Sequence, residues 1–427
     1  MNEELKAGVG LSRKWDAREA GREVVLSTLE KLDGENPKFF LLFSTIHYEK
    51  YGGFQELLNG VWDVLPEGTP LIGGTVAGFM NNYGCYTRGA TALAVSYPNM
   101  DVAIGVGENT RKNPKYAAGK CTKSVIEKLS ISKFPNKIFL DIMPGPTRPS
   151  FPGVGSHWVI SSPVIARAAP KLLEMSVKQF QLGQGLEDDI IEYLADYLKE
   201  YLIFGCSSSD DNKLETNYQF VENKVDKFSL IGIGLSTDLK FDFAHADGLL
   251  STGVKFKITK TAQNGRIIKA LNEKPASRIF FEKVGIPVEL LDDRILRTTF
   301  FYPLGFRASD GRICPNAIGC VLKDYLALNY SIKGDDLELF IASGETLVGA
   351  VHEAVNSLSI KKPRFGFIIS CLARLEALGT GTFKVKEILD EYFGDTPYLL
   401  LYTGGENTKF PNELPHHYNE TFNILVA

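Results

Sequence analysis

The fold is decided by the stretch Phe-Phe-Leu-Leu-Phe-Ser at residues 39–44, an apolar run that ends in a polar residue. A segment of helical character, 54–65, follows it, and a second apolar run then ends in Gly-Gly-Thr at 73–75. A strand, a helix and a strand in this order predict a right-handed crossover between two parallel strands. Because neither run alternates apolar with polar residues, we expect both faces of these strands to be covered.

The same order recurs twice further along the chain. The later copies begin with apolar runs at 137–141 and 365–369, continue with helices at 187–199 and 384–392, and reach their second strands at 201–204 and 398–402. In the helix at 187–199 the apolar residues recur at helical spacing. Further strand-like runs follow the copies, and their short connections predict antiparallel pairing; they lie at 90–97, 102–106, 228–235, 239–243 and 421–426.

The sequence therefore predicts an α/β fold of mixed sheets flanked by helices, built from three related β-α-β units. Residues 250–360 read differently and predict an antiparallel α+β insert. Within it, Asn264-Gly265 indicates a hairpin, and Ser343 is placed to cap a helix over 343–358. We expect two domains, residues 1–250 with two repeated units and residues 251–427 with the third.

The longest irregular segment, 143–170, holds six prolines and interrupts the second copy. A connection of this length is typically functional or disordered. The presence of His157 and Trp158 makes full disorder less expected. Two interpretations stay open: the segment covers a pocket, or it runs over the surface.

Composition excludes several classes of protein. The 427 residues include 47 Lys and Arg and 51 Asp and Glu, for a formal charge of −4, without the basic excess of a general nucleic-acid binder. No apolar run approaches the ~20 residues that span a bilayer, and the first residues lack the pattern of a signal peptide. Six cysteines without a C-x-x-C pair are no disulfide scaffold. We therefore expect a cytoplasmic protein with reduced thiols.

Motifs along nearly the whole chain resemble those of the FIST family, the sensory domains named for F-box and intracellular signal transduction proteins. The N-terminal domain is indicated by Gly-Val-Gly-Leu-Ser at 8–12 and Leu-Ile-Gly-Gly-Thr-Val-Ala-Gly at 71–78. The C-terminal domain is indicated by short motifs at 264–266, 274–276, 303–305, 370–374, 402–406 and 419–421. The chain departs from the family pattern at Leu400 and at Thr403-Gly404, which bears on the shape of that turn.

The resemblance implies a ligand-sensing module of signal transduction, with amino acids as suggested ligands. In many family members the domain is fused to a kinase, a cyclase or another output. This chain leaves no residues for such an output, so we expect it to signal to a separate protein. Some members resemble haem-based gas sensors; His47, His157 and His245 are the candidate ligands for haem here, and the residues do not rank them.

The predicted binding site lies where the strands of the three units end, because ligands of α/β sheets sit beyond the carboxyl ends of parallel strands. Arg374 offers a fork suited to a carboxylate and Glu406 an acceptor for an ammonium group, a pair that suits an amino acid. The alternative is that these two side chains pair with each other or cap turns. The predicted ligand-binding residues are Gly73, Gly74, Thr75, Gly205, Cys206, Ser207, Ser208, Cys371, Arg374, Gly405, Glu406 and Asn407.

An enzyme is the rival class. Cys371 at a strand end is a candidate nucleophile, with His416 and His417 as candidate bases; a buried structural cysteine and a solvated loop pair of histidines are the alternatives. The His352-Glu353 pair lacks the second histidine of a zinc motif, since Asn356 stands in its place. With no phosphate-binding loop either, we expect no metal and no cofactor. A pure interaction module that binds a kinase or cyclase remains the third class.

Overall fold

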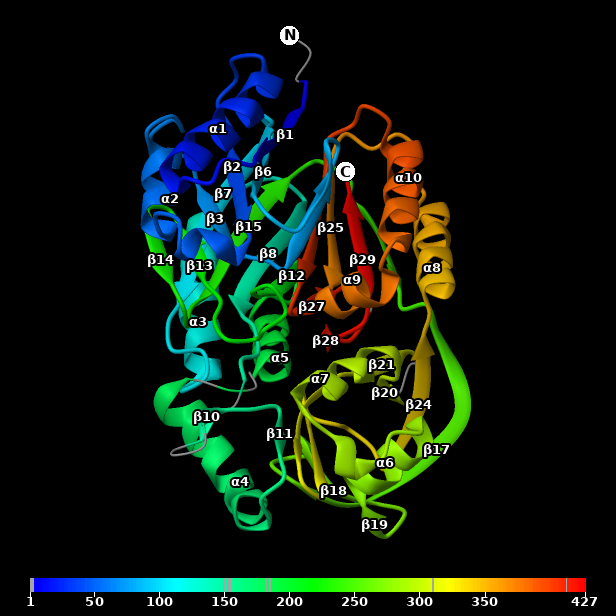
Figure 1. Ribbon diagram of the computed structural model, residues 1–427. Helices are drawn as coiled ribbons and strands as arrows, with labels where there is room; N and C mark the ends of the chain where they lie inside the picture. The colour runs from blue at the N-terminus through cyan, green and yellow to red at the C-terminus, as the bar shows by residue number, and fades with distance from the viewer. Residues whose placement is uncertain are drawn as a thin grey trace.

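The computed structural model describes residues 4–148, 150–151, 155–181, 183, 186–308, 311–411 and 413–427. It confirms the predicted class, a mixed α/β fold of open sheets flanked by helices. Three six-stranded sheets form a core, and two insertions form a second lobe beside it, in the lower half of Figure 1. No described helix is both long and apolar enough to cross a membrane.

The three core sheets share one plan. The first has the order β1 (Lys6–Ser12), β6 (Ala90–Ser96), β2 (Phe39–Ser44), β3 (Leu71–Thr75), β13 (Gln219–Val221) and β14 (Lys224–Asp226). The second has the order β7 (Met100–Gly107), β15 (Leu230–Thr237), β8 (Asn136–Pro144), β12 (Leu202–Ser208), β27 (Gly405–Lys409) and β28 (His416–Tyr418). The third has the order β16 (Asp242–Ala246), β29 (Phe422–Val426), β25 (Gly366–Cys371), β26 (Tyr398–Thr403), β4 (Gly78–Asn81) and β5 (Gly84–Tyr86).

Each sheet centres on the predicted parallel pair, which is β2 with β3, β8 with β12, or β25 with β26. The hairpin that follows each pair joins a neighbouring sheet. Thus β4 pairs with β26, β13 with β3, and β27 with β12, so the three units exchange hairpins in a closed cycle. This exchange ties the two ends of the chain together through strand hydrogen bonds.

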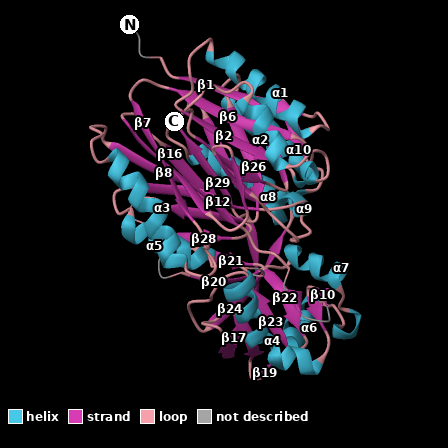
Figure 2. Ribbon diagram, turned by 90° about the vertical axis from the view of Figure 1, so that its left-hand side faces the viewer, coloured by secondary structure: helices cyan, strands magenta, loops and turns pink. Residues whose placement is uncertain are grey.

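Helices cover the outer face of each sheet (Figure 2), and the inner faces meet in a common apolar core. In β2, Phe39, Leu41 and Phe43 belong to that central core, whereas Phe40 and Leu42 pack under helices, so both faces of the strand are buried as expected. The covering helices are α1 (Ala17–Leu29), α2 (Phe54–Trp62), α3 (Pro114–Leu129), α5 (Glu187–Tyr197), α8 (Gly344–Ser357), α9 (Leu372–Leu378) and α10 (Gly381–Phe393).

The insertion lobe is made of residues 145–186, between β8 and α5, and 247–343, between β16 and α8. The two insertions share one sheet, because β11 (Val159–Ile160) of the first pairs with β22 (Ile318–Leu322) of the second. The other strands are β17 (Leu249–Ala262), β18 (Ile267–Leu271), β19 (Lys274–Pro275), β20 (Leu304–Arg307), β21 (Ile313–Asn316), β23 (Tyr325–Leu328), β24 (Asp336–Ala342) and the separate pair β9 (Ser150–Phe151) and β10 (Gly155–Ser156). Its helices are α4 (Pro163–Met175), α6 (Ala276–Val284) and α7 (Asp293–Leu296).

Two local predictions for the second insertion are confirmed. β17 and β18 form a hairpin whose turn holds Asn264 and Gly265 at positive φ. Ser343 caps α8, since its hydroxyl accepts a hydrogen bond from the amide of Thr346 at 3.3 Å.

The prediction of an irregular segment over 143–170 is wrong in part. Ser162 caps α4, and Pro163 stands at its start, where a missing N–H costs nothing. The helix then continues through Pro170. Pro149, Pro152 and Gly153 of this segment lie outside the described residues.

Candidate functional site

The predicted strand ends do meet. At the junction of β3, β12 and β26, three backbone hydrogen bonds run from one unit to the next. The amide of Ala77 donates to the carbonyl of Tyr402 at 2.9 Å, that of Gly404 to Ser207 at 2.9 Å, and that of Ser209 to Thr75 at 2.8 Å. Within each β-α-β unit, the residue whose amide donates stands two positions after the residue whose carbonyl accepts. The three hydrogen bonds therefore form a closed ring. We call this region the strand-end junction.

The glycines of the junction are explained by close packing within the sheets. A Cβ atom on Gly73 would stand 1.7 Å from the carbonyl oxygen of Leu42, and one on Gly205 would stand 2.2 Å from the carboxyl of Asp141. Thr75, Ser207 and the other polar members of the junction are buried. The ligand-binding role of these residues stays a prediction, and the two cavities described below are lined by other residues.

Arg374, the proposed carboxylate fork, is completely buried on α9. Its guanidinium donates to the backbone carbonyls of Asp247, Leu347 (3.1 Å) and Glu420 (3.4 Å). Burial lowers the pKa of Arg374, with the nearby Glu420 carboxyl opposing the change. Arg374 therefore braces three segments of the chain from inside the core.

Glu406 is buried on β27 and accepts from the backbone amide and the hydroxyl of Thr421, the latter at 2.7 Å. Burial raises the pKa of Glu406 to about 8. Its other carboxyl oxygen has no hydrogen-bond partner among the described residues. The structure thus places Glu406 near Arg374 without a direct hydrogen bond between them, unlike the alternative in which the two side chains pair.

The histidine interpretation needs a correction, because the expected solvated pair lies in strand β28. His417 is only 5% exposed, and its ring Nδ1 is 2.7 Å from Oδ1 of Asn407. Tertiary packing against β27 buries it, which the polar neighbourhood in the sequence concealed. Cys371 is also buried, and burial raises the pKa of its thiol well above the ordinary value, the opposite of activation as a nucleophile.

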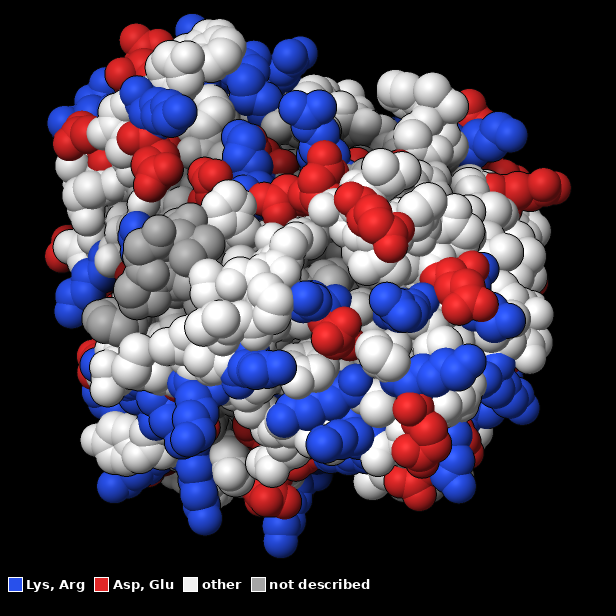
Figure 3. All heavy atoms as spheres, turned by 60° about the horizontal axis from the view of Figure 1, so that its bottom comes forward, with Lys and Arg blue, Asp and Glu red and all other residues white. Residues whose placement is uncertain are grey.

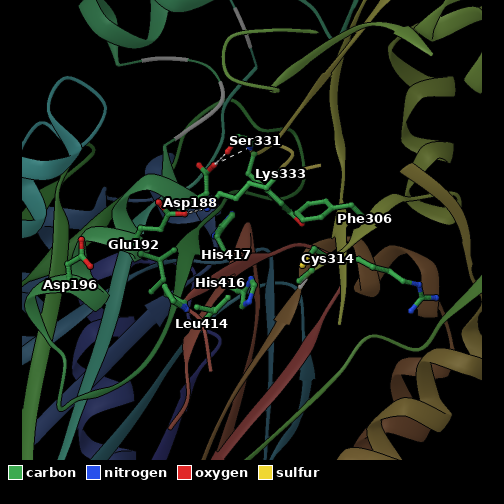
Figure 4. A pocket seen from close by; sticks show the side chains of 15 residues that line it. Asp188, Glu192, Asp196, Phe306, Cys314, Ser331, Lys333, Leu414, His416 and His417 are labelled. Carbon is green, nitrogen blue, oxygen red and sulfur yellow. Dashed lines mark hydrogen bonds and ion pairs between the residues drawn. The ribbon is translucent and has the colours of Figure 1, made fainter. Parts of the chain in front are cut away.

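A cavity of about 470 Å³ lies between the core and the insertion lobe, and we call it the interlobe cavity. Its walls come from α5, from the β20–β21 hairpin, from residues 330–333, and from residues 414–417 leading into β28. Figure 4 shows the side chains from these elements converging on it. The cavity is therefore built jointly by segments that are far apart in the sequence.

Three carboxylates line the α5 wall of the interlobe cavity: Asp188, Glu192 and Asp196. Their spacing of four residues places them on one face of the helix. Glu192 forms an ion pair with Lys333 of the insertion lobe. Asp196 is exposed and makes no hydrogen bond or ion pair among the described residues.

Asp188 anchors the insertion lobe to the core. It is buried, pairs with Arg266, and accepts from the amide (3.1 Å) and hydroxyl (2.5 Å) of Ser331. Burial alone would raise the pKa of Asp188, but Arg266 and Ser331 outweigh it and lower that pKa below its ordinary value. The carboxylate is therefore held ionised between the two lobes.

A chain of hydrogen bonds leads from the cavity wall into the core. His417 lines the cavity and contacts Asn407, whose side-chain amide donates to Asp141 at 2.8 Å. Burial lowers the pKa of His417 to about 4 and raises that of Asp141 to about 8, so the ring is neutral at pH 7. Asn407 is thus a predicted site residue that contacts the cavity wall directly through His417.

Asp188, Ser331 and Lys333 are site residues that the sequence did not predict. The one available signal was the spacing of three carboxylates along the predicted helix 187–199. Each of the three alternative haem ligands has a polar neighbour: His47 lies beside Thr45, His157 beside Asp293 and His245 beside Asn423. Within the described residues, no group of three or more His, Cys, Asp or Glu side chains is arranged to hold a metal ion.

The chain matches no curated protein. Among solved structures it is similar to a crystal structure of cyanuric acid hydrolase from A. caulinodans, with 10% sequence identity, a TM-score of 0.29, and coverage of 56% of this chain and 73% of that one. So weak a likeness carries no argument about function.

A family model gives a stronger result. The model described as the FIST N domain matches residues 38–274, which is more than half of the chain. The match includes the parallel pairs of the first two sheets and α5. A C-terminal FIST domain, which the later motifs predict, is not separately matched. On the strength of the match over 38–274, this chain belongs to the FIST family.

Proposed function

We propose that this chain is a small-molecule-sensing module of signal transduction that binds an amino acid or a similar polar metabolite in the interlobe cavity. The observation that carries the proposal is a cavity of about 470 Å³ between two lobes, with both charge signs on its walls. That volume falls within the ordinary range of small-molecule sites. Membership of a family named for signal transduction supports the same conclusion.

The charges on the walls suit a zwitterion. Asp196 and Glu192 offer carboxylates to an ammonium group, while Lys333 and Arg307 offer donors to a carboxylate. Phe306 supplies an apolar surface for the rest of the ligand. Lys333 is 67% exposed on its side chain and Glu192 45%, so their ion pair is weak enough for a ligand to replace.

A ligand in this position would act on both lobes at once. The Glu192–Lys333 and Asp188–Arg266 pairs cross between the core and the insertion lobe. A ligand that exchanges one of these contacts for its own favours the arrangement of lobes that it binds best. We propose that a separate kinase or cyclase in the cytoplasm reads this change.

The test is calorimetry and thermal unfolding of the intact chain with the twenty standard amino acids. A true ligand at ~100 times its dissociation constant adds about 2.7 kcal/mol to the free energy of unfolding. The variants Lys333→Met and Asp196→Asn each remove one charged contact, worth about 1.5–3 kcal/mol, and weaken binding roughly tenfold or more. Lys120→Met removes an exposed lysine that pairs with Glu108 outside the cavity and serves as the matched control.

If no amino acid stabilises the wild type, or if Lys333→Met and Lys120→Met bind equally well, the interlobe site is wrong. The signalling step is tested separately. A candidate kinase or cyclase partner should be retained on the immobilised chain to a different extent with and without the ligand, and equal retention contradicts the relay.

A further inference from the structure

A second cavity, of about 510 Å³, lies on the other side of the Asp188–Arg266 bridge. Its walls come from the start of α3, from α4 and the turn after it, from the start of α5, and from the β17–β18 hairpin. Arg266 and Ser331 line it, and Ser331 also lines the interlobe cavity. The two cavities are therefore neighbours that share a wall.

Basic side chains dominate this second cavity. Arg111, Lys112, Lys178 and Arg266 line it, against Glu174 and Asp189. The two acids are already paired, Glu174 with Lys178 at 2.6 Å and Asp189 with Arg266 at 3.4 Å. This leaves Arg111 and Lys112 without a hydrogen-bonded carboxylate anywhere in the described part of the chain.

Arg111 is the most informative of these groups because it is only 2% exposed. Its guanidinium donates to the carbonyl oxygens of Gln181 (2.6 Å) and Gly145, and its Nε has no partner among the described residues. Carbonyl oxygens orient the group but do not cancel its charge, and burying an uncompensated charge is expensive. The Glu187 carboxyl acts on Arg111 through its charge, but no hydrogen bond between the two is present among the described residues, and burial raises the pKa of Glu187 to about 7. An anion in the cavity would supply the missing charge.

The insertion lobe as a whole also carries an excess of positive charge. The two insertions, 145–186 and 247–343, carry 18 Lys and Arg and 12 Asp and Glu, whereas the whole chain has 47 and 51. Figure 3, in which the insertion lobe comes forward, shows many of these basic side chains on the exposed face. Such a field attracts anions to the insertion lobe.

The lining and the volume of the second cavity indicate which class of anion it could bind. Leu173, Val177 and Pro114 add an apolar wall next to the basic groups. A volume of about 510 Å³ is far more than a bare tetrahedral anion fills. Arg forks and lysine ammonium groups are the usual partners of phosphoryl oxygens.

We propose that the second cavity binds a phosphoryl group, held by Arg111, Lys112 and Arg266. The source of that group is either inorganic phosphate or a small phosphoester whose apolar part lies against α4. This site is separate from the proposed amino acid site, so either proposal can fail while the other stands.

The experiment is calorimetry on the intact chain at constant ionic strength, with inorganic phosphate, glycerol 3-phosphate, glucose 6-phosphate and, as anion controls, sulfate and acetate. Tighter binding of a phosphoester than of inorganic phosphate identifies a phosphorylated metabolite, and the reverse order identifies the free ion. Binding of acetate as tight as that of the phosphates, or no phosphate binding up to about 10 mM, overturns the proposal.

Variants place the site. Lys112→Met should weaken phosphate binding at least threefold and Lys112→Glu at least tenfold, as expected for one or two units of charge beside the ligand. Lys115→Met removes another exposed lysine, which lies in α3 three residues after Lys112 and does not line the cavity, and should change binding less than twofold. Equal weakening by Lys112→Met and Lys115→Met would mean a diffuse surface effect and overturn the site. Arg111→Lys, checked for folding by circular dichroism, should weaken phosphate binding more than Lys112→Met does.

Discussion

Arg374 separates the two interpretations of the strand-end junction, as a ligand fork or as an internal brace. The substitution Arg374→Met keeps an unbranched apolar stem but removes the guanidinium. It leaves the carbonyl oxygens of Asp247, Leu347 and Glu420 without that donor inside the core. Each lost partner costs about 1–3 kcal/mol, partly offset because a buried charge no longer has to be desolvated. We expect a net loss of about 3 kcal/mol in the free energy of unfolding.

The assay is urea unfolding followed by circular dichroism, with Arg278→Met as control. Arg278 is exposed on α6, and its loss should change the free energy of unfolding by less than about 0.5 kcal/mol. The brace interpretation is refuted if Arg374→Met unfolds like the wild type while losing amino acid binding. That result would return the ligand to the strand-end junction, where the sequence predicts it.

Three further predictions concern stability. Burial raises the pKa of Asp141 to about 8. Between about pH 4 and 8 the folded state therefore binds one proton more than the unfolded state. The free energy of unfolding should fall as the pH rises through that window, by up to about 1.4 kcal/mol per pH unit. Thermal unfolding from pH 5 to 8.5 should show a smaller slope in Asp141→Asn, and an unchanged slope contradicts the assignment. Gly73→Ala should lower the free energy of urea unfolding by more than about 2 kcal/mol, because the added Cβ would overlap the carbonyl oxygen of Leu42. The control Gly349→Ala, in open space on α8, should be neutral or stabilising. Similar losses in both variants would show that backbone contact is not the cause. Ser343→Ala should cost about 1 kcal/mol through loss of the α8 cap, and no measurable change would mean that the cap contributes nothing.

The predicted elements that the structure confirms are those with a local signal in the sequence. The apolar runs at 39–44, 137–141 and 365–369 became central strands because burial on both faces favours apolar residues at consecutive positions. The hairpin at Asn264-Gly265 and the cap at Ser343 depend on the preferences of neighbouring residues, so the sequence alone was enough for them. The family resemblance, confirmed over residues 38–274, rests on the same kind of local motif.

The other features depend on contacts between residues that are distant in the sequence. The exchange of hairpins among three sheets joins Leu399 to Asn81 and Ile203 to Lys409, pairings that no local pattern specifies. His417 stands in a polar stretch, yet packing against β27 buries it. The cavities exist because two insertions fold back onto α5 and the start of α3. Asp188 meets Ser331 across 143 residues of chain. Apart from the carboxylate spacing along 187–199, a site assembled over such separations leaves no pattern in the sequence by which it could be found.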